Sequence, residues 1–387
     1  MTIKIVSLTL LAAFMSMASC GDSGKNETPE PKPIFQTSGK SNNKIQVALL
    51  LDTSSSMDGL IEQAKARLWD IVNTLTTLKY QGKTPIIEIA LYEYGNENLS
   101  PDSNYIRQVS ALTTDLDLIS EKLFSLTTYG GDEYCGAVIS DATKRMDWGR
   151  NETDMKLIYI AGNEEFNQGG TAYTEAIREA REHNIYINTI FCGDRSEATS
   201  SLWKSAADKG AGKFFNINAD EQIAYIETPY DSQIRKCNER MNGTYVQYGK
   251  MGEQKKQNQT FQDANAMSVS DAVATERSVS KSTAAYDNTS WDLVDKVKED
   301  KNALKSIQKE ELPAHLQGKS AKEIEKYVAK KTQERKGIQQ KIGALNIKRQ
   351  EYIEKEQRKN GKQNDLSAAI KRSVIELAKT KGYTVEQ

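Results

Sequence analysis

An almost unbroken apolar run at residues 45–51, IQVALLL, is the first strong signal in the hydrophobic pattern of this chain. Such a run is typical of a central parallel strand that is buried on both faces of a sheet. Apolar residues then recur at helical spacing from Leu60 to Leu78, which predicts an amphipathic helix behind the strand. Further strands are predicted at 86–94, 105–112, 157–161, 185–192 and 213–218, and helices at 115–126, 135–147, 173–183, 200–209 and 221–242.

Strands that alternate with helices of these lengths predict the α/β class. We expect residues 44–242 to form one domain, built on a doubly wound, mostly parallel, Rossmann-like sheet in which 105–112 is an antiparallel edge strand. Open sheets of this kind bind their ligands at the carboxyl ends of the strands, so that edge is the first place to look for a site.

The character of the sequence changes after residue 242. Residues 243–290 carry few large apolar side chains, which predicts a polar linker or a strip that lies on the domain surface. Residues 291–387 are predicted to be a charged α-helical region with a break at Pro313 and a narrow apolar seam along a long helix near 320–357. We expect a helical hairpin or short coiled coil, which either packs back on the domain or serves as a partner-binding arm.

The first residues, MTIKIVSLTLLAAFMSMASC, indicate the compartment. Residues 1–19 have a lysine near the start, a short apolar stretch and small residues before Cys20, which is the pattern of a secretory signal peptide. The residues around Cys20 resemble the lipobox of bacterial lipoproteins. We therefore expect Cys20 to be lipidated and residues 20–43 to form a disordered tether. This predicts a membrane-anchored lipoprotein of the bacterial cell envelope, on its periplasmic or its surface face.

Composition and charge exclude several classes of function. Lys and Arg number 52 and Asp and Glu 53, a net charge of −1, so no global field draws nucleic acid or anionic lipid. The two histidines, His183 and His315, do not stand beside a convincing nucleophile. The GKS and GKT tripeptides lack the upstream glycine that a phosphate-binding loop requires. We therefore expect no enzymatic activity, no small-molecule substrate and no binding of nucleic acid.

Three oxygen-bearing residues follow the first strand on a tight turn: Asp52, Ser54 and Ser56. One carboxylate and two short hydroxyls suit a hard cation such as Mg²⁺. The alternative is that this Ser-rich turn only caps the helix behind it. A metal site of this kind keeps one coordination position open, and a carboxylate from a partner protein can fill it.

This D-x-S-x-S turn, placed between a buried strand and a helix, resembles the start of the metal-ion-dependent adhesion site (MIDAS) of von Willebrand factor A (vWA) domains. The resemblance implies that Asp52, Ser54 and Ser56 are metal ligands and that the protein binds another protein rather than catalysing a reaction. The motifs GDEYCG, AGNEEFNQGG and NTIFCGD are similar to those of a subgroup of bacterial envelope vWA proteins.

Two further loops depart from the pattern of that family, in which a Thr and an Asp complete the site. Here Glu133 stands where the Thr would be, and Gly162 takes the Asp position, followed by Asn163 and Glu164. One interpretation is that Glu133, Asn163 and Glu164 supply the missing oxygens in a modified MIDAS for Mg²⁺, Mn²⁺ or Ca²⁺. The other is that the site is vestigial and its loops contact proteins directly.

The cysteines give one structural prediction. If Cys20 carries lipid, three remain, and an oxidising envelope permits a disulfide. Cys135 opens a predicted helix and Cys192 ends a strand at the same edge of the sheet, so we expect a Cys135–Cys192 bridge, with two buried free thiols as the alternative. Cys237 is then expected to be a core thiol.

The sequence thus predicts a non-enzymatic, lipid-anchored envelope protein that binds a protein partner, through an Asp or Glu side chain, at a divalent-metal site. The alternative is a metal-independent envelope scaffold that assembles through its C-terminal helices. In both cases the lipid anchor provides the contact with the membrane.

Overall fold

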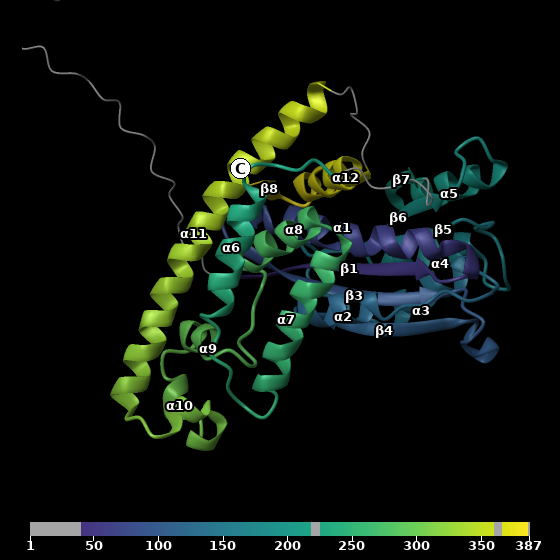
Figure 1. Ribbon diagram of the computed structural model, residues 1–387. Coiled ribbons are helices and arrows are strands. Elements are labelled where there is room, and N and C mark those ends of the chain that lie inside the picture. The colour runs from purple at the N-terminus through teal and green to yellow at the C-terminus, as the bar shows by residue number, and fades with distance from the viewer. Residues whose placement is uncertain (1–39, 218–224, 360–365, 386–387) are drawn as a thin grey trace, which may run out of the picture. The chain divides into compact units, whose positions relative to one another are not determined.

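A six-stranded sheet with the strand order β4-β3-β1-β5-β6-β7 is the centre of the computed structural model, which describes residues 40–217, 225–359 and 366–385 (Figure 1). Its strands are β1 (Lys40–Asp52), β3 (Thr84–Tyr94), β4 (Ile106–Thr113), β5 (Met155–Gly162), β6 (Ile185–Cys192) and β7 (Ala211–Ile217). All neighbouring strands are parallel except β3 and β4. The α/β fold class and the antiparallel edge strand are therefore confirmed, whereas Cys20 lies outside the described residues.

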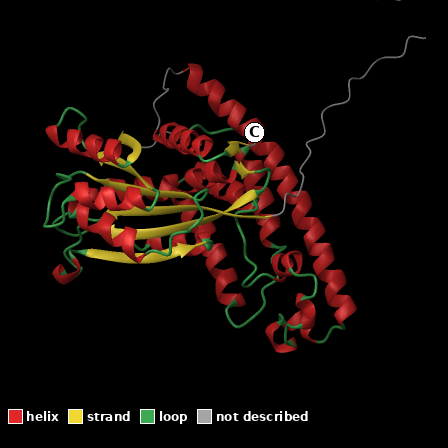
Figure 2. Ribbon diagram, turned by 180° about the vertical axis from the view of Figure 1, so that it is seen from behind, coloured by secondary structure: helices red, strands yellow, loops and turns green. Residues whose placement is uncertain are grey.

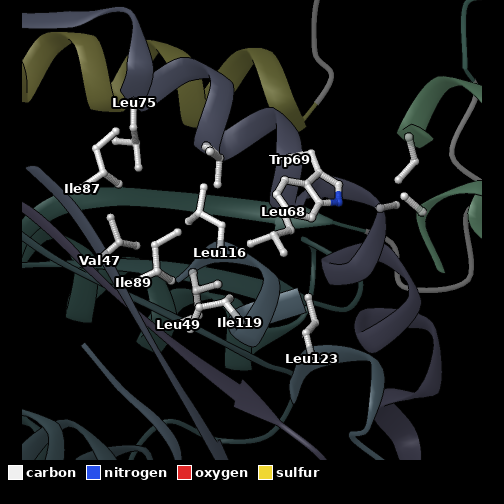
Figure 3. Close-up of a cluster of buried hydrophobic side chains, with 14 of the residues drawn as sticks. Val47, Leu49, Leu68, Trp69, Leu75, Ile87, Ile89, Leu116, Ile119 and Leu123 are labelled. Atoms are coloured by element: carbon white, nitrogen blue, oxygen red, sulfur yellow. The ribbon is translucent and has the colours of Figure 1, made fainter. Parts of the chain in front are cut away.

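Helices cover both faces of this sheet. They are α1 (Asp58–Thr76), α2 (Leu116–Phe124), α3 (Cys135–Arg145), α4 (Tyr173–Glu182) and α5 (Ala198–Lys209). Successive residues of β1 point to opposite faces: Val47, Leu49 and Leu51 join one hydrophobic cluster, while Ala48 and Leu50 join the other. Figure 3 shows part of the first cluster, in which side chains of α1 and α2 pack onto β1 and β3.

Residues 243–290, expected as a polar linker or a strip on the domain surface, contain two helices that pack on the domain. These are α7 (Gly252–Val269) and α8 (Asp271–Lys281), which pack together with α6 (Asp231–Asn242) over α1 and α2. The polar composition did not predict packed helices, because many of the side chains buried between these helices are polar. Gln259, Gln262, Arg277 and Lys281 are all buried, with their polar groups paired inside the protein.

The buried cations of α8 are neutralised by carboxylates on two other helices. Nη1 of Arg277 lies 2.8 Å from Asp117 Oδ1 on α2, and its Nε donates to Asp263 Oδ1 on α7 at 2.6 Å. Nζ of Lys281 donates to both carboxylate oxygens of Asp263 at 2.9 Å. Burial alone would raise the pKa of Asp263, but the charges of Lys281 and Arg277 hold it below its usual value. The Arg277 guanidinium also stacks over the Trp69 ring of α1.

Two further buried arginines attach the 39-residue helix α11 (Ala321–Lys359) to the same body. Nη1 of Arg335 lies 2.6 Å from Asp292 Oδ2, just before α9 (Leu293–Glu299). Nε of Arg349 donates to Asp231 of α6 at 2.8 Å, and its Nη1 lies 2.6 Å from Glu276 of α8. Both arginines are less than 5 % exposed, so these ion pairs are shielded from water.

The C-terminal region is helical, as expected, and a new helix, α10 (Ala314–Gln317), begins directly after Pro313. Among the described residues, the two long helices do not form the expected pair. Helix α11 contacts α6, α8 and α9, and α12 (Leu366–Thr380) contacts α1 and β7, so each packs on the body of the protein rather than on the other (Figure 2). A short strand that the sequence did not predict, β8 (Tyr383–Val385), pairs with β2 (Leu78–Tyr80).

Residues Ser38–Gln387 form one compact unit. The buried ion pairs link its C-terminal helices to the helices of the sheet domain, so the two parts are expected to unfold together. Within the described ranges, no helix combines the length and the apolar character that crossing a membrane requires.

Removing the shared acid of the buried cluster tests this linkage. Asp263→Asn leaves Arg277 and Lys281 buried with one carboxylate fewer, which is expected to lower the free energy of unfolding by about 3–5 kcal/mol in a urea titration. Asp271→Asn is the matched control, because its ion pair with Arg235 lies near the surface and is worth less than about 1 kcal/mol. Equal small losses in the two variants would contradict the role given to the buried cluster.

Candidate functional site

The turn predicted to bind metal lies where β1 ends. Asp52 is the last residue of β1, a 3₁₀ turn follows at Ser55–Met57, and α1 begins at Asp58. The Asp52 side chain is wholly buried, and its Oδ1 accepts a hydrogen bond from the Ser54 backbone N–H at 2.8 Å. The hydroxyls of Ser54 and Ser56 lie 3.2 Å apart, with Ser56 exposed. The three residues predicted from the motif are therefore together at the carboxyl edge of the sheet.

Backbone hydrogen bonds hold the second loop, residues 127–134, against this turn. The Tyr129 N–H donates to the Thr53 carbonyl at 3.0 Å, and the Ser55 N–H donates to the Gly130 carbonyl at 3.2 Å. This pairing carries Glu133 inward, where it is only 3 % exposed. Its carboxylate lies close enough to Asp52 for each to change the pKa of the other.

Gly95, directly after β3, makes room for the two acids. A Cβ at this position would lie 2.8 Å from Glu133 Cγ and 2.9 Å from Asp52 Oδ1, and the φ angle of +76° is one that side chains with a Cβ rarely adopt. Both the conformation and the close approach therefore require glycine here. Gly95 stands in the YEYGN segment, where nothing in the sequence pattern marks it as part of a site.

The two acids form a buried carboxylate pair, Asp52 and Glu133, without a buried cation among the described residues to neutralise it. Burial raises the pKa of Asp52 to about 7, and burial together with the Asp52 charge raises the pKa of Glu133 to about 9. Asp52 Oδ2 and Glu133 Oε2 are both buried and accept no hydrogen bond from any described residue. Two strong acceptors are thus left available for a proton or a cation.

The third loop follows β5. Gly162, which takes the family's Asp position, has no room for a side chain: a Cβ would lie 2.6 Å from the Tyr94 hydroxyl and 3.0 Å from Asp52 Oδ2. The Tyr94 hydroxyl donates to the Ala161 carbonyl at 2.9 Å and so fills this place. Tyr94 is therefore a further residue of the site, which the sequence did not predict. In the sequence, Tyr94 is only one of several aromatic residues in a predicted strand, so nothing distinguishes it.

The residues after Gly162 reach the site to different degrees. The Asn163 side-chain amide lies 3.2–3.3 Å from the Ser56 hydroxyl, so it joins the exposed side of the turn. The Glu164 side chain is exposed, and its backbone carbonyl accepts a hydrogen bond from the Trp203 indole at 2.8 Å. Its negative charge nevertheless contributes to the raised pKa of Asp52 and Glu133. Glu164 therefore lies at the rim of the site, outside its buried part.

The expected Cys135–Cys192 disulfide is wrong: both cysteines are buried and free, as is Cys237. Cys135 belongs to the hydrophobic cluster on one face of the sheet and Cys192 to the cluster on the other face. Both lie at the carboxyl edge, as the sequence indicated, but the sheet itself separates them. Cys237 packs in the core on α6, as expected.

The donor set limits the kind of metal that this site suits. Across the described ranges, no three or more His, Cys, Asp or Glu side chains gather as a metal-binding group. The site offers two carboxylates, two hydroxyls and an amide, which are the hard oxygen donors preferred by Mg²⁺, Mn²⁺ and Ca²⁺ rather than the His and Cys sets typical of zinc.

Residues 46–229 match the family model described as the von Willebrand factor type A domain. The resemblance deduced from the sequence is confirmed over this range, which we call the VWA region. It includes every residue of the site described above. No curated protein matches the chain.

Solved structures with 11–17 % identity also match. One is the SpRpn10 VWA domain, 16 % identical, covering 46 % of this chain and 90 % of its own, with a TM-score of 0.34. Another is an aerotolerance-related membrane protein from Bacteroides fragilis NCTC 9343, with mutations to serine: 17 % identity, 46 % and 93 % coverage, TM-score 0.31. A third is proximal thread matrix protein 1 from the mussel byssus with zinc in its MIDAS motif: 15 % identity, 46 % and 43 % coverage, TM-score 0.36.

The raised pKa values predict how metal-free stability depends on pH. The folded state holds protons on Asp52 and Glu133 that the unfolded chain releases near pH 4, so their stabilising contribution is lost as pH rises toward 7 and 9. Glu133→Gln removes most of this loss. In chelator, between pH 5 and pH 8, the variant is expected to lose roughly 2–4 kcal/mol less stability than wild type in urea unfolding.

Asp132→Asn is the control for that experiment, because it makes the same change of charge at the adjacent, exposed position. Its pH profile should follow that of wild type. Parallel profiles for all three proteins would show that the two acids do not share a buried environment.

Proposed function

We propose that this protein is a non-enzymatic adhesion module, which binds a divalent cation at the carboxylate pair and through it a carboxylate of a partner protein. The observation that carries the proposal is the pair of buried, unpartnered oxygens, Asp52 Oδ2 and Glu133 Oε2, at the carboxyl edge of a parallel sheet. Burying two adjacent carboxylates is costly unless a proton or a cation compensates them. A divalent cation would balance both charges.

The residues present fit such a cation. Asp52, Glu133, Ser54 and Ser56 would hold it, with the Asn163 amide next to Ser56 on the exposed side. When bound, the cation supplies a positive centre that accepts an oxygen ligand from outside. Mg²⁺ is the first choice because it prefers few carboxylates and retains exchangeable waters, while Mn²⁺ and Ca²⁺ accept the same donors. Glu133 takes the place of the family's Thr and adds a negative charge to the site. This charge replaces the one that is lost because Gly162 stands at the family's Asp position.

A partner carboxylate is the natural occupant of the open position. Ser56 and Asn163 lie at the surface, so a side chain approaching from solvent can reach the site, whereas Asp52 and Glu133 close it from below. An Asp or Glu of another protein combines negative charge with the oxygen donor that these cations prefer. Interaction modules with this arrangement bind rather than convert their ligand, and among the described residues neither His183 nor His315 contacts the carboxylate pair.

The proposal places the protein at the bacterial envelope, held to a membrane by lipid on Cys20. Support comes from the sequence alone, because residues 1–19 have the pattern of a signal peptide and residues 17–20 resemble a lipobox. Anchoring would concentrate the adhesion site near the membrane, so that even a weak metal-mediated contact becomes effective.

The alternative scaffold function, with assembly through free C-terminal helices, is less well supported. Arg335 and Arg349 engage α11 in buried ion pairs, and α12 packs on α1 and β7. Releasing either helix to serve as an arm would expose these buried groups and break their pairing.

Metal binding is testable without a partner. With Mg²⁺ or Mn²⁺ at 100 times the dissociation constant, the purified wild-type protein should gain about 2.7 kcal/mol of stability in thermal or urea unfolding. Asp52→Asn and Glu133→Gln should show no metal-induced gain, whatever their stability in chelator. Asp132→Asn, at the exposed position next to Glu133, is the control and should retain the gain. A wild type that is unaffected by either metal would exclude the metal site.

Adhesion is tested by a crosslinking pull-down of tagged full-length protein from intact envelopes. We expect at least one co-purifying protein that disappears both in chelator and with Asp52→Ala, because either change removes the cation that its carboxylate would bind. Asp208→Ala, an exposed acid on α5 that ion-pairs with Lys204, is the control and should retain the partner. A partner that persists in all samples would contradict metal-mediated adhesion and favour the scaffold function.

A further inference from the structure

Five lysines of α11 lie on one stripe of the helix: Lys326, Lys330, Lys341, Lys348 and Lys355. Their spacings of four, eleven, seven and seven residues are close to whole numbers of turns at 3.6 residues per turn, so the side chains stay on one side. All five are exposed. At 1.5 Å per residue the lysine stripe is about 44 Å long.

The body of the protein holds this stripe toward solvent. The opposite side of α11 carries the buried residues Val328, Ile338 and Ile342, together with Arg335 and Arg349 and their ion pairs. The helix therefore cannot rotate about its axis without breaking buried contacts. The orientation of the lysine stripe is fixed by the fold rather than by the lysines themselves.

The charges of the stripe are not neutralised by the protein. None of the five lysines forms an ion pair with any residue in the described ranges, although α11 contains many acids. Glu334 pairs with Lys331, Glu354 with Arg358 and Glu356 with Lys359, all outside the five. Glu351 lies on the same side, between Lys348 and Lys355, but forms no ion pair with either. The net charge of the chain is near zero, but the lysine stripe is a local row of unpaired positive charges.

We propose that the lysine stripe of α11 is a docking surface for an anionic lipid bilayer. The residues between the lysines on this side are Gln333, Gly337, Gln340, Ala344 and Glu351. They supply neither the large apolar side chains that a coiled-coil partner needs nor the aromatic rings on which nucleic-acid bases stack. A long, straight, rigidly held row of lysines matches an extended planar surface of phosphate headgroups, which needs only positive charge to attract it.

Such docking orients the molecule as well as binding it. A lipid anchor on a flexible tether would leave the folded unit free to rotate, whereas a charged line against the bilayer fixes one side of it. The inference does not depend on the metal site, because α11 contributes no residue to it.

The test uses residues 38–387, which form one compact unit without the N-terminal segment. In chelator and at low salt, this protein should co-float with vesicles containing phosphatidylglycerol and not with pure phosphatidylcholine vesicles, and binding should weaken steeply as salt is raised. Replacing Lys341, Lys348 and Lys355 by glutamine should weaken binding on the order of 100-fold.

The control replaces Lys209, Lys301 and Lys309 by glutamine, an equal change of charge at exposed positions outside α11. It should bind vesicles within about threefold of wild type. Equal losses in the two triple variants would overturn the proposal, because binding would then follow net charge rather than the stripe. Failure of the wild type to bind anionic vesicles, or binding only to soluble polyphosphate, would also overturn it.

Discussion

The need to neutralise buried cations shapes this protein more than any other constraint. Arg277 and Lys281 have no access to water, so carboxylates must come to them from α2 and α7. Arg335 and Arg349 impose the same condition on α11. Segments more than a hundred residues apart in sequence are therefore fixed to one another by charge pairs whose separation would leave a buried ion uncompensated. The C-terminal helices therefore pack on the VWA region and stabilise it.

Helix α1 connects these buried ion pairs to the carboxylate pair. The guanidinium of Arg277 stacks on Trp69 in the middle of α1, and the first residue of α1 follows the turn that carries Ser54 and Ser56. Backbone hydrogen bonds from this turn to Tyr129 and Gly130 then hold the loop that delivers Glu133. The ion pairs elsewhere thus hold in position two buried acids that have no cation to neutralise them, which is how a fold can keep an unfavourable arrangement in place.

The sequence predicted the parts of the fold that depend on periodicity and on adjacent residues. The parallel strands, the edge strand and the cluster of Asp52, Ser54 and Ser56 follow from local patterns, and Glu133 followed from its place in a loop. The packing of α7 could not be predicted in this way, because a helix buried through Gln259 and Gln262 lacks an apolar stripe. Helix α8 was missed because its buried Val273 and Val279 alternate with buried polar residues. The disulfide prediction failed because two cysteines at one edge can still face opposite sides of a sheet. Tyr94 and Gly95 were missed because their importance is a matter of close approach, which sequence spacing does not encode.

Charge in this chain falls into three environments that a net value of −1 cannot distinguish. Buried cations matched by buried acids serve stability, and removing either partner damages the fold. Buried acids without a cation, Asp52 and Glu133, mark a place where a ligand can improve on the protein's own pairing. Exposed lysines without ion pairs, on a helix that cannot rotate, mark a second such place at the surface. In the second and third environments the folded structure fixes the charge and leaves its compensation to another molecule, which is the physical basis for inferring binding rather than catalysis.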